Sequence, residues 1–248
     1  MAFSISISAL GMIIDVNEIC GDLMMAIKIY TIPLGFDTCY VIRDTGIIMI
    51  DSGAPKKVKD FVKALEKISI KPEEIQLVVI THGHWDHIGS AMDIKGITGA
   101  KIAMHQLEID WLEKSSNQMP PGVNLWGRLI GTIMKIFLPL VRIPSTHVDI
   151  VLGEEDFSLA EYGIPGKVIY TPGHSSGSIS VLLDTGDGFV GDLAMNKFPL
   201  RLSPGLPIFA EDLMKVKESW NLLLDRGIKT VYPAHGEPFS AATIQKAL

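Results

Sequence analysis

Short runs of aliphatic residues alternate with longer amphipathic segments along most of the 248-residue chain. Two of these runs, IIMI at 47–50 and LVVI at 77–80, are apolar at every position, which is typical of strands covered on both faces. The same pattern predicts strands at 27–32, 39–43, 47–50, 76–80, 101–104, 167–170, 179–183, 188–190 and 230–232.

Two segments between these strands have apolar residues at the three- and four-residue spacing of a helix that buries one face. The first runs from Val58 to Ile68 with lysines interspersed, and the second runs from Leu213 to Leu223, with Gly227 as its C-cap. Strands that alternate with helices predict an α/β fold built in layers. We expect one domain over residues 25–248.

Residues 105–150 interrupt this alternation as an apolar insertion. Within it, one face of an expected helix over 126–137 is formed by Trp126, Ile130, Ile133 and Phe137. Two cations and two glycines in the same stretch argue against a membrane span. The helix could pack on the domain, contact a second subunit in a homodimer, or cover a substrate pocket. We favour the pocket, because insertions often carry binding residues over a rigid scaffold.

The first 24 residues stand apart from this pattern. Phe3, Ile5 and Ile7 alternate with serines, which is typical of an added edge strand. The segment lacks a basic region of the kind that opens a signal peptide, so we interpret it as an N-terminal extension. The two cysteines, Cys20 and Cys39, are expected to stay reduced.

Composition narrows the class of protein. Hydrophobic residues make up 47% of the chain and charged residues 20%, which excludes a disordered chain. The net charge of −6 argues against binding to nucleic acid, whose affinity depends on Lys and Arg. We therefore expect a cytoplasmic protein that acts on a small molecule.

The strongest chemical signal is THGHWDHIG at residues 81–89. It places His82, His84, Asp86 and His87 within six residues. Such a group would be costly to bury without a cation, because each imidazole and carboxylate loses its hydration. Imidazole and carboxylate are ligands of zinc, iron and manganese. The motif therefore predicts a metal site.

Three other expected strands are followed closely by a candidate ligand. KVIYTPGH ends in His174, GFVGD ends in Asp192 and TVYPAHG ends in His235. Because ligands bind beyond the carboxyl ends of strands in open α/β sheets, we expect these side chains to meet the first motif. Asp51, which follows the IIMI strand, could orient a ligand from behind.

Seven candidate ligands are too many for one tetrahedral ion. They suit two ions with one carboxylate bridging them, and two Zn²⁺ fit best, with iron or manganese as alternatives. The remaining histidines, His105 and His147, lie outside these motifs and are expected to be packing or surface residues.

In this order, THGHWDHIG, TPGHSSGS, GDL and YPAHG resemble the motifs of the metallo-β-lactamase superfamily. The resemblance covers roughly residues 25–240 and implies a four-layer αββα sandwich. It implies that one metal is held by His82, His84 and His174, that the second is held by Asp86, His87 and His235, and that Asp192 bridges them. Many true β-lactamases of the superfamily have a cysteine where this chain has Asp192, whereas glyoxalase II, lactonases and phosphodiesterases resemble it more closely.

This resemblance predicts a metal-dependent hydrolase in which a hydroxide bridging two metal ions attacks the substrate. Asp86 is the expected catalytic residue, since it can ligate a metal and orient the hydroxide. We expect an ester, lactone or thioester as substrate. The alternatives are a phosphodiesterase, a mononuclear iron oxidoreductase of the persulfide-dioxygenase type, weak β-lactam hydrolysis as a side activity, and a non-catalytic binding protein.

Overall fold

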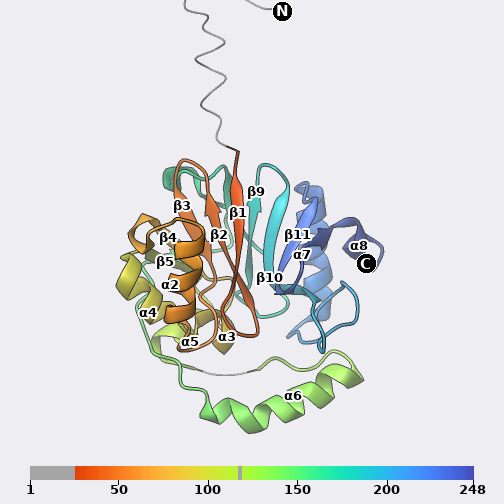
Figure 1. Ribbon diagram of the computed structural model, residues 1–248. Helices are drawn as coiled ribbons and strands as arrows, with labels where there is room; N and C mark the ends of the chain where they lie inside the picture. Colours follow the sequence, from red (N-terminus) through yellow and green to blue (C-terminus); the bar gives the residue numbers. More distant parts are fainter. Residues whose placement is uncertain (1–25, 117–118) are drawn as a thin grey trace, which may run out of the picture.

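Two six-stranded sheets face each other in the computed structural model, which describes residues 26–116 and 119–248 (Figure 1). The first sheet contains, in spatial order, β1 (Lys28–Pro33), β2 (Thr38–Arg43), β3 (Ile47–Ile50), β4 (Leu77–Val79), β5 (Lys101–His105) and β6 (Ile150–Leu152). The second contains β12 (Phe239–Ser240), β11 (Thr230–Gly236), β10 (Asp187–Asn196), β9 (Ile179–Leu183), β8 (Gly166–Tyr170) and β7 (Phe157–Ser158).

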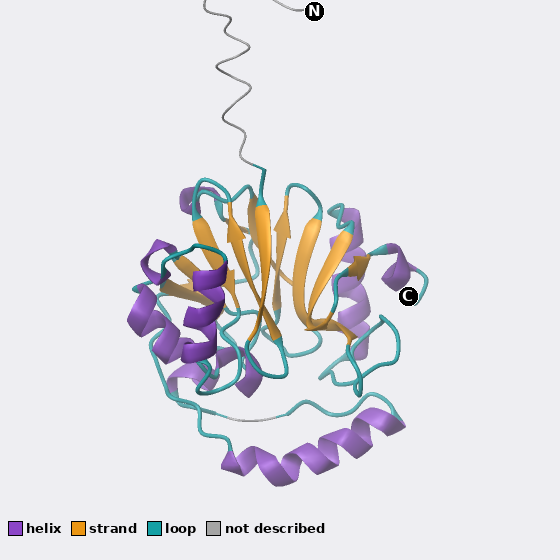
Figure 2. Ribbon diagram, in the orientation of Figure 1, coloured by secondary structure: helices purple, strands orange, loops and turns teal. Residues whose placement is uncertain are grey.

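Helices cover the outer faces of both sheets (Figure 2). The described helices are α2 (Val58–Lys67), α3 (Trp85–Ile88), α4 (Ala91–Thr98), α5 (Ile109–Glu113), α6 (Leu125–Phe137), α7 (Leu213–Asp225) and α8 (Ala242–Gln245), with short 3₁₀ turns at Pro72–Glu74, Leu138–Leu140 and Ala160–Tyr162. Helices α2, α4 and α5 lie on the first sheet and α7 lies on the second. The predicted four-layer αββα sandwich is confirmed.

The fully apolar strands are explained by this layering. In β3, Met49 packs outward in a cluster with Phe61 of α2, while Ile48 and Ile50 point inward and pack with Phe189 of the second sheet. Successive side chains of a strand point to opposite faces, so a strand between two apolar layers needs an apolar residue at every position.

The nine predicted strands are all present, and the structure adds three short ones, β6, β7 and β12. β10 and β11 also continue past the ends expected for them. Asp192 and His235 therefore lie within strands and do not follow them, which corrects the sequence-based placement. Parallel pairing of β10 with β11 shifts register around Gly191 and resumes at Met195. Residues 1–24, with the edge strand expected there, lie outside the described residues.

Helix α6 forms as predicted and is capped by Asn124, whose side chain accepts a hydrogen bond of 2.7 Å from the Gly127 amide. Gly127 and Gly131 face the domain and are buried. A Cβ on Gly127 would lie 2.2 Å from the Ile208 carbonyl oxygen, so glycine allows the helix to approach the backbone closely. Among the described helices, none is both long and apolar enough to cross a membrane.

Candidate metal centre

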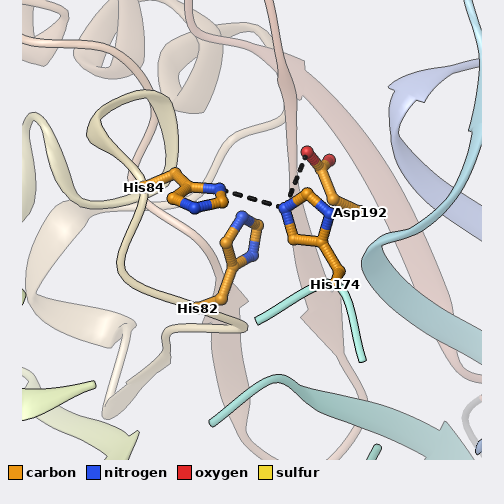
Figure 3. A group of neighbouring side chains, drawn as sticks. All are labelled: His82, His84, His174 and Asp192. Atoms are coloured by element: carbon orange, nitrogen blue, oxygen red, sulfur yellow. Dashed lines mark hydrogen bonds and ion pairs between the residues drawn. The ribbon is translucent and has the colours of Figure 1, made fainter. Parts of the chain in front are cut away.

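The seven candidate ligands meet at one edge of the sandwich, in two groups. The ligand atoms within each group all lie within 4.8 Å of one another. The first group is His82, His84, His174 and Asp192 (Figure 3), and the second is Asp86, His87 and His235. All seven residues are buried. The set is called the ligand cluster below.

Four parts of the chain bring this cluster together. The loop after β4 and the short helix α3 carry the THGHWDHIG residues. The turn after β8 carries His174, and β10 and β11 carry Asp192 and His235. Gly191, just before Asp192, has a left-handed φ of 51°, and a Cβ there would lie 2.5 Å from Thr81 Oγ1. A glycine at this position therefore lets the Asp192 strand approach the first motif.

Asp192 lies between the two groups. Its Oδ2 is 3.5 Å from His174 Nε2 in the first group. Its Oδ1 is 3.6 Å from His87 Nε2 and 3.3 Å from His235 Nε2 in the second. One oxygen thus faces each group, which is the arrangement required of a carboxylate that bridges two cations.

The spacing of the ligand atoms fits metal coordination. His84 Nδ1 and His174 Nε2 are 3.0 Å apart, and His235 Nε2 is 3.4 Å from Asp86 Oδ2. Two nitrogens bound tetrahedrally to zinc at ~2.0–2.1 Å would be separated by ~3.3 Å. The buried Nε2 atoms of His82 and His87 have no hydrogen-bond partner within the described residues. Unpaired buried nitrogens beside ligand atoms at this spacing fit a metal site better than a hydrogen-bonded core.

Hydrogen bonds behind the cluster fix the direction of two imidazoles. Asp51 Oδ2 lies 2.9 Å from His87 Nδ1, and the Phe209 carbonyl oxygen accepts a bond of 2.9 Å from His174 Nδ1. The other Asp51 oxygen accepts bonds from the amide and hydroxyl of Thr81. These partners leave the Nε2 atoms of His87 and His174 facing the cluster. Asp51 therefore has the geometry expected of a residue that orients a ligand.

The cluster has opposite electrostatics on its two sides. Burial and the neighbouring imidazoles hold the pKa of His82 and His84 well below the usual range, so both are neutral and can donate a lone pair. Burial also opposes charge on His235, but the carboxylates of Asp192 and Asp86 outweigh it and raise its pKa to about 9. The second group thus favours positive charge in its vicinity, as a cation would supply.

Two further buried carboxylates were missed by the sequence analysis. Glu108 accepts hydrogen bonds of 2.9 Å from the amides of Gly83 and Gly177, so it ties the loop of the first motif to the loop that carries His174. Asp37 accepts a bond from Cys39 Sγ at 3.6 Å, and burial raises its pKa to about 7. Neither residue lies in a recognisable motif, and the role of Glu108 depends on contacts distant in sequence.

The two histidines expected outside the site do lie outside it. His105 is buried and stacks on Tyr170, with ring centroids 4.5 Å apart. His147 is exposed and its Nδ1 lies 2.7 Å from a carboxylate oxygen of Glu113. Cys39 is buried and forms no disulfide within the described residues, and Cys20 lies outside them.

A pocket opens beside the cluster, with an empty volume of about 410 Å³ that includes space open to solvent. Its polar side is formed by five residues of the cluster: His84, Asp86, His174, Asp192 and His235. Its apolar lining consists of Phe36, Trp85, Met119, Pro120, Met134, Met195, Leu200 and Phe209. A pocket of this size suits a small molecule with an apolar part.

Helix α6 contributes to this pocket through Met134, and not through the four residues named from the sequence. Ile130 packs against Met195, Leu200 and Phe209 in a neighbouring apolar cluster. Trp126, Ile133 and Phe137 are exposed by 46%, 48% and 60%. The helix period was read correctly, but which face meets the pocket depends on how the helix is docked through Gly127 and Gly131.

Comparison with curated proteins identifies relatives over most of the chain. The chain is 26% identical over 206 residues to a protein of Methanocaldococcus jannaschii called "Probable metallo-hydrolase MJ0888", covering 80% of this chain and 86% of that one. It is 27% identical over 208 residues to the "Metallo-beta-lactamase fold-containing protein ST1585" of Sulfurisphaera tokodaii, covering 81% and 72%.

Solved structures show the same fold. The crystal structure of the archaeal protein ST1585 matches with a TM-score of 0.61 and 25% identity, over 89% of this chain and 84% of that chain. The structure titled "BLEG-1 B3 metallo-beta-lactamase" matches with a TM-score of 0.64 and 21% identity, over 87% and 95%. The model of the metallo-beta-lactamase superfamily matches residues 32–235, a span that contains the whole ligand cluster, and the chain therefore belongs to that superfamily.

Proposed function

We propose that this protein is a hydrolase that holds two metal ions, zinc in the first instance, and cleaves an ester, lactone or thioester with a hydroxide held between them. Bound zinc would supply Lewis acidity and lower the pKa of a bound water towards ~7. Membership of the superfamily and similarity to a protein named as a probable metallo-hydrolase support hydrolysis.

The observation that carries the proposal is the position of Asp192. One of its oxygens faces the first group and the other faces the second, at 3.3 to 3.6 Å from the nearest imidazole nitrogens. Burial opposes a charge on this carboxyl, but His235 and His87 outweigh burial and hold its pKa well below the usual range. A carboxylate that stays ionised between two groups of ligand atoms can face two cations and offset the repulsion between them.

The residues of the chain have separable roles in this proposal. His82, His84 and His174 would hold one ion, Asp86, His87 and His235 would hold the second, and Asp192 would bridge them. Asp86 also lines the pocket, so its carboxylate can accept a hydrogen bond from the attacking water and orient it. Met134, Leu200 and Phe209 form an apolar wall that suits the acyl part of a substrate.

We also propose that the substrate is a small molecule, that the protein acts in the cytoplasm, and that it does not bind nucleic acid. The net charge of −6 disfavours a phosphate backbone as partner. A homodimer is compatible with the proposal and is not required by it, because all seven ligands come from one chain.

The decisive experiment measures metal content and activity on the same sample. After loading with zinc, iron or manganese, each preparation is assayed against short and long p-nitrophenyl esters, an acyl-homoserine lactone and an acyl-glutathione thioester. We expect two zinc ions per chain and turnover of at least one carboxylic substrate. Fastest turnover of bis(p-nitrophenyl) phosphate would indicate a phosphodiesterase. One iron per chain with oxygen uptake on glutathione persulfide would indicate the oxidoreductase, and turnover of nitrocefin alone would indicate a β-lactamase.

A further inference from the structure

Helix α6 exposes an apolar face that no other part of the described chain covers. This outer face consists of Leu125, Trp126, Leu129, Ile133, Ile136 and Phe137, which are exposed by 46% to 84%. The opposite face carries Gly127 and Gly131 against the domain and Met134 in the pocket wall. Figure 1 shows the helix lying along one end of the sandwich, with one side turned away from it. So many exposed apolar side chains on one element mark an interaction surface.

A second segment adds to this surface. In the loop after β10, Phe198 is exposed by 73% and Leu202 by 93%. The loop contacts the start of α6, because the indole N–H of Trp126 donates a hydrogen bond of 2.8 Å to the Pro199 carbonyl oxygen. The outer face of α6 and residues 197–202 are together called the apolar platform.

The two segments of the chain that contain the platform carry formal charges of one sign. Residues 119–148 and 193–210, which contain both parts of it, include five of the 22 Lys and Arg residues of the chain and none of the 28 Asp and Glu residues. Arg128, Lys135 and Arg142 are exposed. In a chain with a net charge of −6, the two segments with these exposed apolar side chains therefore carry only positive formal charges. The partner of this surface is therefore both apolar and anionic.

We propose that the apolar platform docks the protein on the surface of an anionic lipid bilayer, with α6 lying in the plane of the interface. An amphipathic helix with Trp, Phe and Leu on one face and cations beside it is typical of such binding. Arg128 and Lys135 are seven residues apart, so they project from the same edge of the helix, where their stems can extend to lipid headgroups. Trp126 at the start of the helix suits the boundary between acyl chains and headgroups.

A second copy of the chain fits this surface less well. An isologous contact through α6 would place the cations of one helix opposite those of the other. Neither segment contains an acidic residue that could pair with them. Anionic lipid headgroups supply the opposite charge, whereas a symmetric partner supplies the same charge, which disfavours dimerisation through this face.

The test is binding of the full-length, metal-loaded protein to vesicles, followed by co-sedimentation, with no catalytic readout. We expect binding to vesicles that contain phosphatidylserine, little binding to pure phosphatidylcholine, and weaker binding at high salt. The double variant Ile133→Asp/Ile136→Asp should bind at least about tenfold more weakly, because two apolar side chains leave the bilayer. The double variant Arg128→Glu/Lys135→Glu should bind roughly 30-fold more weakly and lose the preference for phosphatidylserine.

Met214→Asp is the matched control, since Met214 is exposed by 66% on α7 and lies outside the platform. It should bind as the unchanged protein does. Equal binding by all variants, or no binding of the unchanged protein to phosphatidylserine vesicles, would overturn the proposal. A dimer seen by light scattering that Ile133→Asp/Ile136→Asp converts to a monomer, without any vesicle binding, would assign the platform to a second copy instead. Circular dichroism of each variant checks that it is folded.

Discussion

The ligand cluster and helix α6 depart from the usual distribution of side chains in opposite directions. In the cluster, seven ionisable residues are buried, and hydrogen bonds to Asp51 and to the Phe209 carbonyl oxygen fix two of them. In α6, six large apolar residues are exposed, and two glycines hold the helix on the domain. Buried polar groups and exposed apolar surface both cost free energy, so each indicates a function rather than a contribution to stability. The comparison supports two separate proposals, chemistry at the cluster and recognition by α6.

Asp192→Asn should have the largest effect on metal content and activity. An amide keeps the shape of the side chain but removes the charge between the two groups, so we expect loss of at least one metal per chain. Activity should fall more than ~100-fold, beyond the range seen for residues that only support a ligand. Metal analysis and turnover of the best substrate measure both effects. Asp110→Asn, at an exposed carboxylate on α5, is the control and should change neither. Equal behaviour of the two variants would contradict the bridging role.

Asp51→Asn should have a smaller effect on metal binding, at the second group of ligands. Asp51 contacts His87 and Thr81 and is proposed to contact no metal, so its loss misorients His87 without removing a ligand. Metal affinity should fall by ~10–100-fold, with full occupancy recovered at high metal concentration. Titration with a competing chelator gives the affinity. If high metal concentration failed to restore occupancy, Asp51 would itself be a ligand.

Glu108→Gln tests whether the two loops of the site are held together by one carboxylate. The amide nitrogen of glutamine cannot accept, so the N–H of Gly83 or Gly177 loses its buried acceptor. Stability should fall by ~1–3 kcal/mol, measured by denaturant unfolding. Glu66→Gln on the exposed side of α2 is the control. An unchanged stability in Glu108→Gln would show that water or another group replaces this acceptor.

Met134→Ala distinguishes the inner face of α6 from its outer face. Met134 lines the pocket and Trp126 does not, so truncating Met134 should affect long acyl substrates more than short ones. The preference for a longer chain should fall about fourfold for each methylene that loses its contact, at ~0.8 kcal/mol per methylene. Values of kcat/KM for an acetyl and an octanoyl ester measure this. Chain-length dependence that changed in Trp126→Ala but not in Met134→Ala would assign the substrate contact to the outer face.

The smallest effects are expected for alanine substitutions at the two glycines of α6, and the melting temperature should differ between them. Alanine favours a helix over glycine by up to ~1 kcal/mol. At Gly131 the added Cβ would lie 3.3 Å from the Phe209 ring, which can shift, so Gly131→Ala should leave the melting temperature nearly unchanged. At Gly127 the Cβ would lie 2.2 Å from a backbone oxygen, so Gly127→Ala should lower the melting temperature. Similar melting temperatures for both variants would mean that α6 is held less closely than described.

The sequence by itself determined the layers and the composition of the cluster. Strands that are apolar at every position require cover on both faces, and this requirement holds wherever the strands lie in the fold. THGHWDHIG and the residues His174, Asp192 and His235 were identified from short local patterns, because strand ends and metal ligands have local signatures. The same holds for the period of α6, which is set by neighbours along the helix.

Only the tertiary structure decided which side of α6 meets the pocket and which carboxylates support the site. The face of a helix that docks depends on the surface it meets, and here the close approach of Gly127 to the Ile208 carbonyl selects Met134 over Trp126 and Phe137. Glu108 acquires its role from two amides 25 and 69 residues away in the chain. Hydrogen bonds between segments so distant leave no periodic or local pattern, because folding alone brings the partners together.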